Sequence, residues 1–313
     1  MSAFLRGHRY IRTGFLTFSA MLSIVALSTG SARACSVCIA HAIGAALQRI
    51  GAQTFPRGTF VAGVSYLTFG KSSAGDDPGT LENEIYHQTS LDLSYGMTDR
   101  LLLQASLPFV NKHIQATGQP AATANGLGDM SFGAVYQLPP SPHRKMLAAF
   151  NLDLKLPTGK NDLRDAAGNL KDQHLQPGTG SADVSAGVNF TWEGKRPGSL
   201  WFTGLGIRRN GSNSRGYHFG NVLFYNFGYA RPVDRSSALV LEFDGRIAGK
   251  DRQEDGTLDS NSGGHLGYLA LSYRRNLVYG IGLIASYQFP VLSHLNGVQK
   301  ERPLFSLSLS RSF

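Results

Sequence analysis

The stretch TSLDLSYGMTDRLLLQASLPF, residues 89–109, alternates apolar and polar residues on both sides of a turn. Before the turn, leucines alternate with Ser90, Asp92 and Ser94, and after it Leu101, Leu103 and Leu107 share one phase. Successive side chains of a β-strand point to opposite faces of the sheet. The stretch therefore predicts a β-hairpin whose strands each have one apolar face and one polar face.

The same alternation continues to the last residue in twelve segments. Each is roughly 10–15 residues long, whereas strands of globular proteins usually have about 5–6 residues. A tilted strand that crosses a bilayer needs about 9–11 residues, so these lengths suit a membrane. The segments are 58–70, 86–96, 101–113, 127–138, 146–157, 182–193, 199–209, 216–230, 237–249, 264–273, 277–290 and 302–313.

The connections between these segments alternate in length. Tight turns are expected at 96–100, 139–142, 194–198, 231–234 and 274–276, and longer polar loops at 71–85, 114–126, 158–181, 210–215, 250–263 and 291–301. A soluble sandwich alternates too, but long strands with short turns on one side only are typical of a transmembrane β-barrel. Because hydrocarbon tolerates no open sheet edge, we predict an all-β fold, a closed antiparallel barrel of about 12 strands over residues 57–313.

The chain ends in LFSLSLSRSF, residues 304–313. Serines occupy one phase of this segment, and Phe305, Leu307, Leu309 and Phe313 occupy the other. A closing strand with a terminal aromatic residue resembles the signal that the barrel-assembly machinery of bacterial outer membranes recognises. We therefore expect that machinery to be a partner during biogenesis.

Residues 1–34 have the pattern of a secretory signal peptide. Arg6, Arg9 and Arg12 precede the apolar run FLTFSAMLSIVALSTG, and Ala32-Arg33-Ala34 suits signal peptidase. Removal of its four arginines lowers the formal net charge from +9 to +5, too modest a balance to indicate a nucleic-acid partner. We expect a location in the outer membrane of a Gram-negative bacterium, with both termini periplasmic and with lipid and lipopolysaccharide around the barrel.

Residues 35–56 contain the only two cysteines, in CSVCIAH. Cys35, Cys38 and His41 are candidates for a disulfide or for a metal site. Two thiolates suit Cu(I), whereas zinc needs further ligands. A periplasmic disulfide and a lipidated Cys35 remain alternatives. No other cofactor is expected.

The same segment has an apolar spacing typical of a short amphipathic helix. Such a helix would lie in the periplasm or in the lumen as a plug, unless the segment is a flexible tail. The residues that share the apolar face are Ile39, Ile43, Leu47 and Ile50.

Charged residues in the polar phase of the strands are the candidates for the pore lining. Charges are costly in lipid and are tolerated in a wet or paired interior. Because both signs occur on the same faces, they would either set selectivity or form salt bridges that close a narrow barrel. The candidates are Asp92, Asp129, Asp153, Lys155, Asp183, Glu242, Asp244 and Arg246.

Two polar loops are candidates for sites of their own. The loop at 158–181 is long enough to fold into the barrel mouth or to contact surface polysaccharide, although a solvated loop is the simpler expectation. Acidic residues in 250–263 lack the oxygen-ligand spacing of a calcium loop. Neither His87 nor His218 has a serine nucleophile two residues away, so an enzyme is not expected.

Several segments in register resemble one protein family. They include GLGDMSFGAVYQL, FNLDLKLPTGK, QPGTGSADVSAGV, LVLEFDGRIAGKD and LIASYQFPVLSHLNGVQ, together with the opening stretch. The family is the outer-membrane transporter family typified by proteins of the phenol meta-cleavage degradation pathway. The resemblance spans about 57–313 and implies a barrel that passes small molecules, often aromatic or otherwise hydrophobic ones, without catalytic residues.

Two functions remain open at this point. The first is an outer-membrane channel or transporter for a small-molecule substrate, hydrophobic and aromatic compounds included. The second is a plugged barrel with a binding or sensing role, in which the CxxC segment handles a metal ion or a redox partner.

Overall fold

The architecture comes from a computed structural model, which describes residues 50–74, 81–118, 121–139, 146–165 and 167–313. The predicted signal peptide, Cys35, Cys38, His41 and nearly all of the predicted helix lie outside these residues. Ile50, the last residue of that apolar spacing, is described and is not helical. Within the described residues, no helix is long and apolar enough to cross a membrane.

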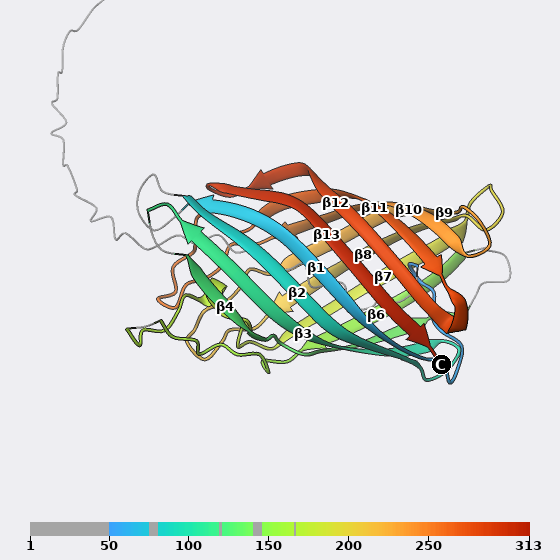
Figure 1. Ribbon diagram of the computed structural model, residues 1–313, viewed down its shortest axis with the longest axis horizontal. Helices are drawn as coiled ribbons and strands as arrows, with labels where there is room; N and C mark the ends of the chain where they lie inside the picture. The colour runs from blue at the N-terminus through green and yellow to red at the C-terminus, as the bar shows by residue number, and fades with distance from the viewer. Residues whose placement is uncertain (1–49, 75–80, 119–120, 140–145, 166) are drawn as a thin grey trace, which may run out of the picture. The chain divides into compact units, whose positions relative to one another are not determined.

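Thirteen strands form one antiparallel sheet that closes on itself (Figure 1). β1 pairs with β2 on one side and with the last strand, β13, on the other, so neither end of the sheet is free. The strands are β1 (Phe60–Ala74), β2 (Leu81–Gly96), β3 (Leu101–Ala116), β4 (Ala122–Leu127), β5 (Ser131–Gln137), β6 (Met146–Lys155), β7 (Asp183–Glu193), β8 (Leu200–Asn210), β9 (Val222–Pro232), β10 (Ser237–Ala248), β11 (Gly264–Asn276), β12 (Ile281–Leu295) and β13 (Gln299–Ser312).

β4 and β5 occupy one position in the barrel wall. β4 pairs with Phe109–Ile114 of β3, and β5 pairs with Leu101–Ser106 of the same strand. The wall therefore has twelve strand positions, and the predicted closed barrel of 12 strands is confirmed. Two short 3-10 helices lie outside the wall, at Gln173–Leu175 and Val278–Gly280.

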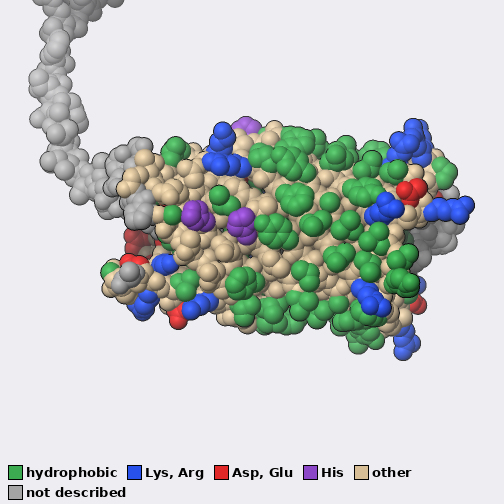
Figure 2. Space-filling view, in the orientation of Figure 1, with side chains coloured by type: hydrophobic (Ala, Val, Ile, Leu, Met, Phe, Trp, Pro, Cys, Tyr) green, Lys and Arg blue, Asp and Glu red, His purple; other side chains and the backbone are tan. Residues whose placement is uncertain are grey.

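The alternation of the opening stretch separates the two faces of the wall. Leu91 and Phe109 point outward, with 47% and 48% of their surface exposed, whereas Ser90 and Asp92 are buried on the inner face. Figure 2 shows apolar side chains spread over the middle of the outer surface, while Lys and Arg gather toward its two ends. This distribution is what a barrel surrounded by hydrocarbon requires.

Three of the predicted long loops are wrong. Much of 71–85 belongs to β1 and β2, most of 114–126 belongs to β3 and β4, and most of 291–301 belongs to β12 and β13. In the first case the polar residues mark a pair across the strands, because Lys71 faces Glu84 in the register and their charged groups lie 2.8 Å apart. The segment predicted at 216–230 begins at Val222 instead, because Tyr217 and Phe219 are buried among the loops.

The two ends of the barrel differ. At the turn end, which we define by the turns at 97–100, 194–199 and 233–236, the chain terminus Phe313 lies beside Phe60 (Figure 1). At the loop end lie the connections 156–182, 211–221 and 249–263. The predicted alternation of short and long connections therefore holds for these six.

Candidate functional site in the barrel lumen

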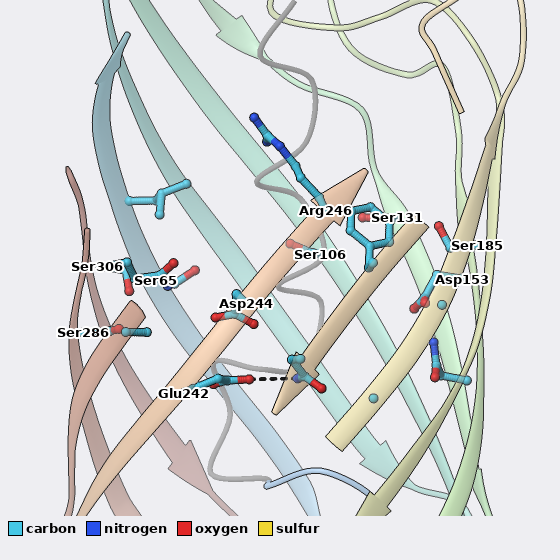
Figure 3. A pocket seen from close by; sticks show the side chains of 18 of the residues that line it. Ser65, Ser106, Ser131, Asp153, Ser185, Glu242, Asp244, Arg246, Ser286 and Ser306 are labelled. Atoms are coloured by element: carbon cyan, nitrogen blue, oxygen red, sulfur yellow. Dashed lines mark hydrogen bonds between the residues drawn. The ribbon is translucent and has the colours of Figure 1, made fainter. Parts of the chain in front are cut away.

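The barrel encloses a cavity of about 390 Å³. Small hydroxyl side chains line much of it, because serines occupy the inward phase of most strands; Figure 3 shows Ser65, Ser106, Ser131, Ser185, Ser286 and Ser306 around it. Such side chains supply hydrogen bonds without filling the lumen. The cavity thus has polar groups set among apolar side chains such as Val135, Phe202 and Leu266, inside a wall that is apolar outside.

All eight of the charged residues that the sequence predicts for the lining line this cavity. Asp92 comes from β2, Asp129 follows β4, Asp153 and Lys155 come from β6, Asp183 from β7, and Glu242, Asp244 and Arg246 from β10. They form two groups. One lies toward the loop end, and the other surrounds the middle of the cavity.

The first group is a charged cluster, formed by Asp129, Lys155 and Asp183 on neighbouring parts of the wall. Lys155 Nζ lies 3.1 Å from Asp129 Oδ2 and 2.7 Å from Asp183 Oδ2. These carboxylates are largely buried, and a buried pair that is well hydrogen-bonded holds its partners in one geometry. A second cavity of about 140 Å³ also has these three residues in its lining. The charged cluster therefore lies where the two cavities meet.

The charged cluster also anchors the long loop. Asp129 accepts hydrogen bonds from the backbone N–H groups of Gly159 at 2.9 Å and Thr179 at 2.8 Å, and the Thr179 hydroxyl contacts Lys155. A solvated loop would not bury such contacts. Of the alternatives open for 158–181, the one in which the loop folds into the barrel mouth agrees with the structure.

A second set of contacts holds the same loop inward. Lys112 Nζ donates to the carbonyl oxygens of His174 and Gln176, at 2.6 and 2.8 Å. Leu175 packs with Ile114 and Ala124 of the wall. Hydrogen bonds from a charged donor are stronger than neutral ones, so Lys112 is a main tether of the loop.

The three loops of the loop end meet at a buried polar cluster of His174, Tyr217 and Asp251. The Tyr217 hydroxyl donates to Asp251 Oδ2 at 2.9 Å and lies 3.0 Å from His174 Nε2. Asp251 also accepts the backbone N–H of Gly220. Burial lowers the pKa of His174, and the nearby Lys71 ammonium lowers it further. The imidazole is therefore neutral in this cluster.

The turn end is narrowed by the chain itself. Ala52 is fully buried against Leu102, Val135 and Ala149 of the inner wall, and its backbone N–H donates to Thr191 Oγ1 at 2.8 Å. Ile50 packs against another apolar cluster on the inner wall, which contains Phe202. The segment 50–55 therefore lies inside the barrel at this end. How the predicted helix upstream of it is placed lies outside the described residues.

The sequence did not point to the polar cluster or to Lys112. Each of these residues lies on a different connection or strand, and only the folding of three loops over one opening brings them together. One signal was available, since Tyr217 and Phe219 are apolar residues in an otherwise polar loop.

No group of three or more His, Cys, Asp or Glu within the described residues could hold a metal ion. The acidic residues of 250–263 do not converge, since Asp251 is engaged by Tyr217 and Asp255 accepts from Thr257. The candidate cysteine site falls outside the described residues.

Comparisons with known proteins agree with this architecture. Residues 66–296 match the sequence profile of a family described as "Putative MetA-pathway of phenol degradation". The COG4313 outer membrane channel from Pseudomonas putida F1 is similar in structure, with a TM-score of 0.64, 16% identity, and coverage of 84% of this chain and 98% of that chain. No curated protein matches the chain.

A second solved structure is similar too. The translocator domain of the autotransporter NalP from Neisseria meningitidis has a TM-score of 0.51 and 10% identity, over 84% of this chain and 91% of that chain. At such identities the likeness concerns the fold, and the fold is that of an outer-membrane barrel.

Proposed function

The chain belongs to the MetA-pathway phenol-degradation family, and we propose that it is an outer-membrane channel for small molecules, hydrophobic and aromatic ones among them. One observation carries the proposal: a cavity of about 390 Å³ runs inside a closed barrel whose outer face is apolar. A closed barrel wall with an apolar outer face isolates the passage inside it from hydrocarbon.

The dimensions of the lumen support a small substrate. Pockets that enclose drug-sized ligands have volumes of about 300–1,000 Å³, so this cavity suits one small molecule at a time. The family description supports aromatic compounds as one class of substrate. The serine lining and the paired charges would let water accompany the solute.

The orientation follows from the two ends. In outer-membrane barrels, short turns face the periplasm and longer loops face outward. We therefore place the turn end, and Phe313 with it, in the periplasm and the loop end toward lipopolysaccharide. The loop 156–182 then guards the outer mouth, and the segment 50–55 guards the inner one.

Conductance in planar bilayers tests the proposal. The mature chain, from Cys35 onward, is refolded and compared with a shortened chain that begins at Thr54, which keeps the hydrogen bond from its hydroxyl to the Asp99 carbonyl. We expect stable openings for the mature chain and wider ones for the shortened chain. If both barrels fold but remain silent, the channel proposal is wrong.

The burial of Ala52 also favours a second candidate, a barrel that is plugged from the turn end and has a binding or sensing role. In that case the CxxC segment would handle a metal ion or a redox partner. A silent barrel that binds Cu(I) or Zn(II) stoichiometrically, and loses the ion on Cys35→Ser, would support this function. Stable openings without metal binding would exclude it.

A further inference from the structure

The charges along the cavity are unequal in number. Among the described residues that line it, six side chains are acidic and four are basic. The bases are Lys155, Arg208, Arg246 and Arg274, and the acids are Asp92, Asp129, Asp153, Asp183, Glu242 and Asp244. A passage with an excess of one charge inside a wall of low dielectric concentrates ions of the opposite charge.

The basic side chains are engaged with other groups of the wall. Lys155 lies between the two carboxylates of the charged cluster, and Arg246 Nη2 lies 3.0 Å from Glu301 Oε1. Glu301 is not among the residues that line the cavity. The positive charge of Arg246 is therefore neutralised by an acid that the count of lining residues does not include. Counted with Glu301, the acids of this part of the wall outnumber the bases.

The other two arginines are engaged as well. Arg208 Nε donates to Ser185 at 3.2 Å, and its guanidinium stacks 5.0 Å from the centre of the Phe224 ring. Arg274 lies close enough to Glu242 for the two to interact electrostatically. Neither guanidinium is positioned at the middle of the passage as an isolated positive charge.

The other acids of the lining surround the middle of the lumen. Asp92 accepts from the hydroxyls of Ser65 and Ser106, both at 2.6 Å, so its partners there are neutral. Asp244 and Glu242, neighbours on the inner face of β10, share a hydrogen bond, so the two carboxyl groups hold a proton between them and together carry one negative charge. Asp153 comes from a third part of the wall, and Figure 3 shows Asp153 and Asp244 on well separated strands around the pocket.

Glycines on the inner wall leave room for the side-chain oxygen atoms of neighbouring acidic and amide residues. Gly133 lies between Gln104 and Asp153 in the register of the sheet, and a Cβ at Gly133 would collide with Asp153 Oδ1. Similarly, a Cβ at Gly204 would lie 2.5 Å from Asn189 Oδ1 and 2.7 Å from Asn226 Oδ1. The inner wall is thus shaped so that acceptor oxygens lie against it without obstruction.

An independent observation concerns hydrogen-bond acceptors that lack a donor. Gln104 is 6% exposed and lines the cavity, and its carbonyl Oε1 has no hydrogen-bond partner among the described residues. Asn226 Oδ1, on the opposite part of the lining, has none either. Buried acceptors are normally satisfied, so these two indicate a donor or a cation supplied by the contents of the lumen.

We propose that the mid-lumen carboxylates of Asp92, Asp153 and the Glu242–Asp244 pair, together with Gln104, make this passage selective for cations and for solutes that bear a protonated amine. This inference rests on the proposed channel function and deepens it by naming the charge of the preferred solute. Acidic side chains around a passage are a common source of cation selectivity. Anionic solutes are disfavoured by the same charges.

The test is the reversal potential of the reconstituted mature chain in a KCl gradient. We expect K⁺ to permeate over Cl⁻ by about tenfold, the lower end of the enrichment that charged clefts produce. Asp92→Asn and Asp153→Asn should each lower the ratio, and the double variant should lower it further. Asp255→Asn is the matched control, because Asp255 is an exposed residue of the loop 249–263 and should leave the ratio unchanged.

Folding of each variant is checked by the gel shift on heating. The double variant Glu242→Gln/Asp244→Asn, which removes the shared charge of that pair, replaces any variant that does not fold. A folded barrel that conducts with equal preference for both ions, or prefers Cl⁻, overturns the inference and leaves the channel function intact. A ratio that the lumen variants leave unchanged also overturns it. A folded and silent barrel overturns both proposals.

Discussion

At the residue scale, Gly51 decides whether the N-terminal segment fits inside the barrel. Its φ is +56°, and a Cβ there would collide with Thr191 Oγ1 and lie 2.9 Å from Phe202 Cβ. Only glycine adopts such a backbone easily at so close an approach. We predict that Gly51→Ala weakens the docking of 50–55 by about 1–3 kcal/mol and increases the conductance. Single-channel recording measures the change.

Gly58 provides the matched control for this substitution. Its φ is +84°, but a Cβ there would have nothing within 4 Å. Gly58→Ala therefore carries the backbone strain without the collision. If both variants increase the conductance equally, the close approach to Thr191 and Phe202 is not what holds the segment.

At the scale of elements, the loop 156–182 depends on Lys112 of β3. Lys112→Met keeps most of the side-chain volume but removes two charge-assisted hydrogen bonds, each worth about 1.5–3 kcal/mol. We predict that the loop leaves the mouth more often and that the current becomes noisier and larger. Limited proteolysis of the refolded barrel should show faster cleavage within 156–182.

Lys171→Met is the matched control within that loop. Lys171 Nζ donates to the Thr123 carbonyl at 2.7 Å, but this contact is exposed to solvent. The same loss of charge should therefore leave cleavage and conductance nearly unchanged. Equal effects of the two variants would argue for a general role of loop charge instead of a tether at Lys112.

The polar cluster makes the docking of the same loop dependent on pH. Burial lowers the pKa of His174 below its ordinary value of 6.5, and Lys71 lowers it further, whereas Asp172, Asp251 and Glu84 raise it. Above pH 6.5 the ring is neutral whether the loop is docked or exposed. Below that pH the exposed loop takes up a proton that the docked loop does not, so docking weakens. We predict that His174→Gln makes proteolysis within 156–182 less sensitive to acid between pH 7 and 5.

Asp259 has the opposite effect on the pH dependence of docking, so its contribution must be distinguished from that of His174. Burial raises its pKa to about 6, so the docked state takes up a proton first. The contribution of Asp259 therefore strengthens docking as the pH falls from about 6 to about 4. Relative to the native chain, Asp259→Asn should become more sensitive to acid in that range, whereas His174→Gln should become less so.

The elements also show what sequence patterns predict well. Strand number, closure and the inward phase of all eight charged candidates followed from period-two alternation, because that pattern is a local property of each strand. The family resemblance is likewise confirmed, by the match over residues 66–296. Strand ends were less predictable at Lys71 and Glu84, since a polar pair across two strands has the same composition as a loop.

The contacts that fill the two barrel ends could not be predicted from the sequence, for a different reason. Lys112 and His174 meet although 62 positions separate them, and Ala52 meets Thr191 across 139 positions. The spacing of residues within one short stretch of sequence cannot predict such long-range contacts. Only the folded barrel, in which the loop after β6 covers one opening and the segment before β1 enters the lumen, places them together.

At the scale of the whole molecule, the two narrowed ends act on one current in series. Segment 50–55 narrows the turn end, and the loop 156–182 narrows the loop end. Since resistances in series add, opening one end leaves the other in control of the current. We predict that the chain beginning at Thr54 and the Lys112→Met variant each increase the single-channel conductance modestly, and that their combination increases it by more than the sum of both changes. The combination of the Thr54 chain with Lys171→Met should behave like the Thr54 chain alone. If the double variant gives only the sum, or if one change alone gives the full increase, a single end limits the current and the other end is open in the native barrel.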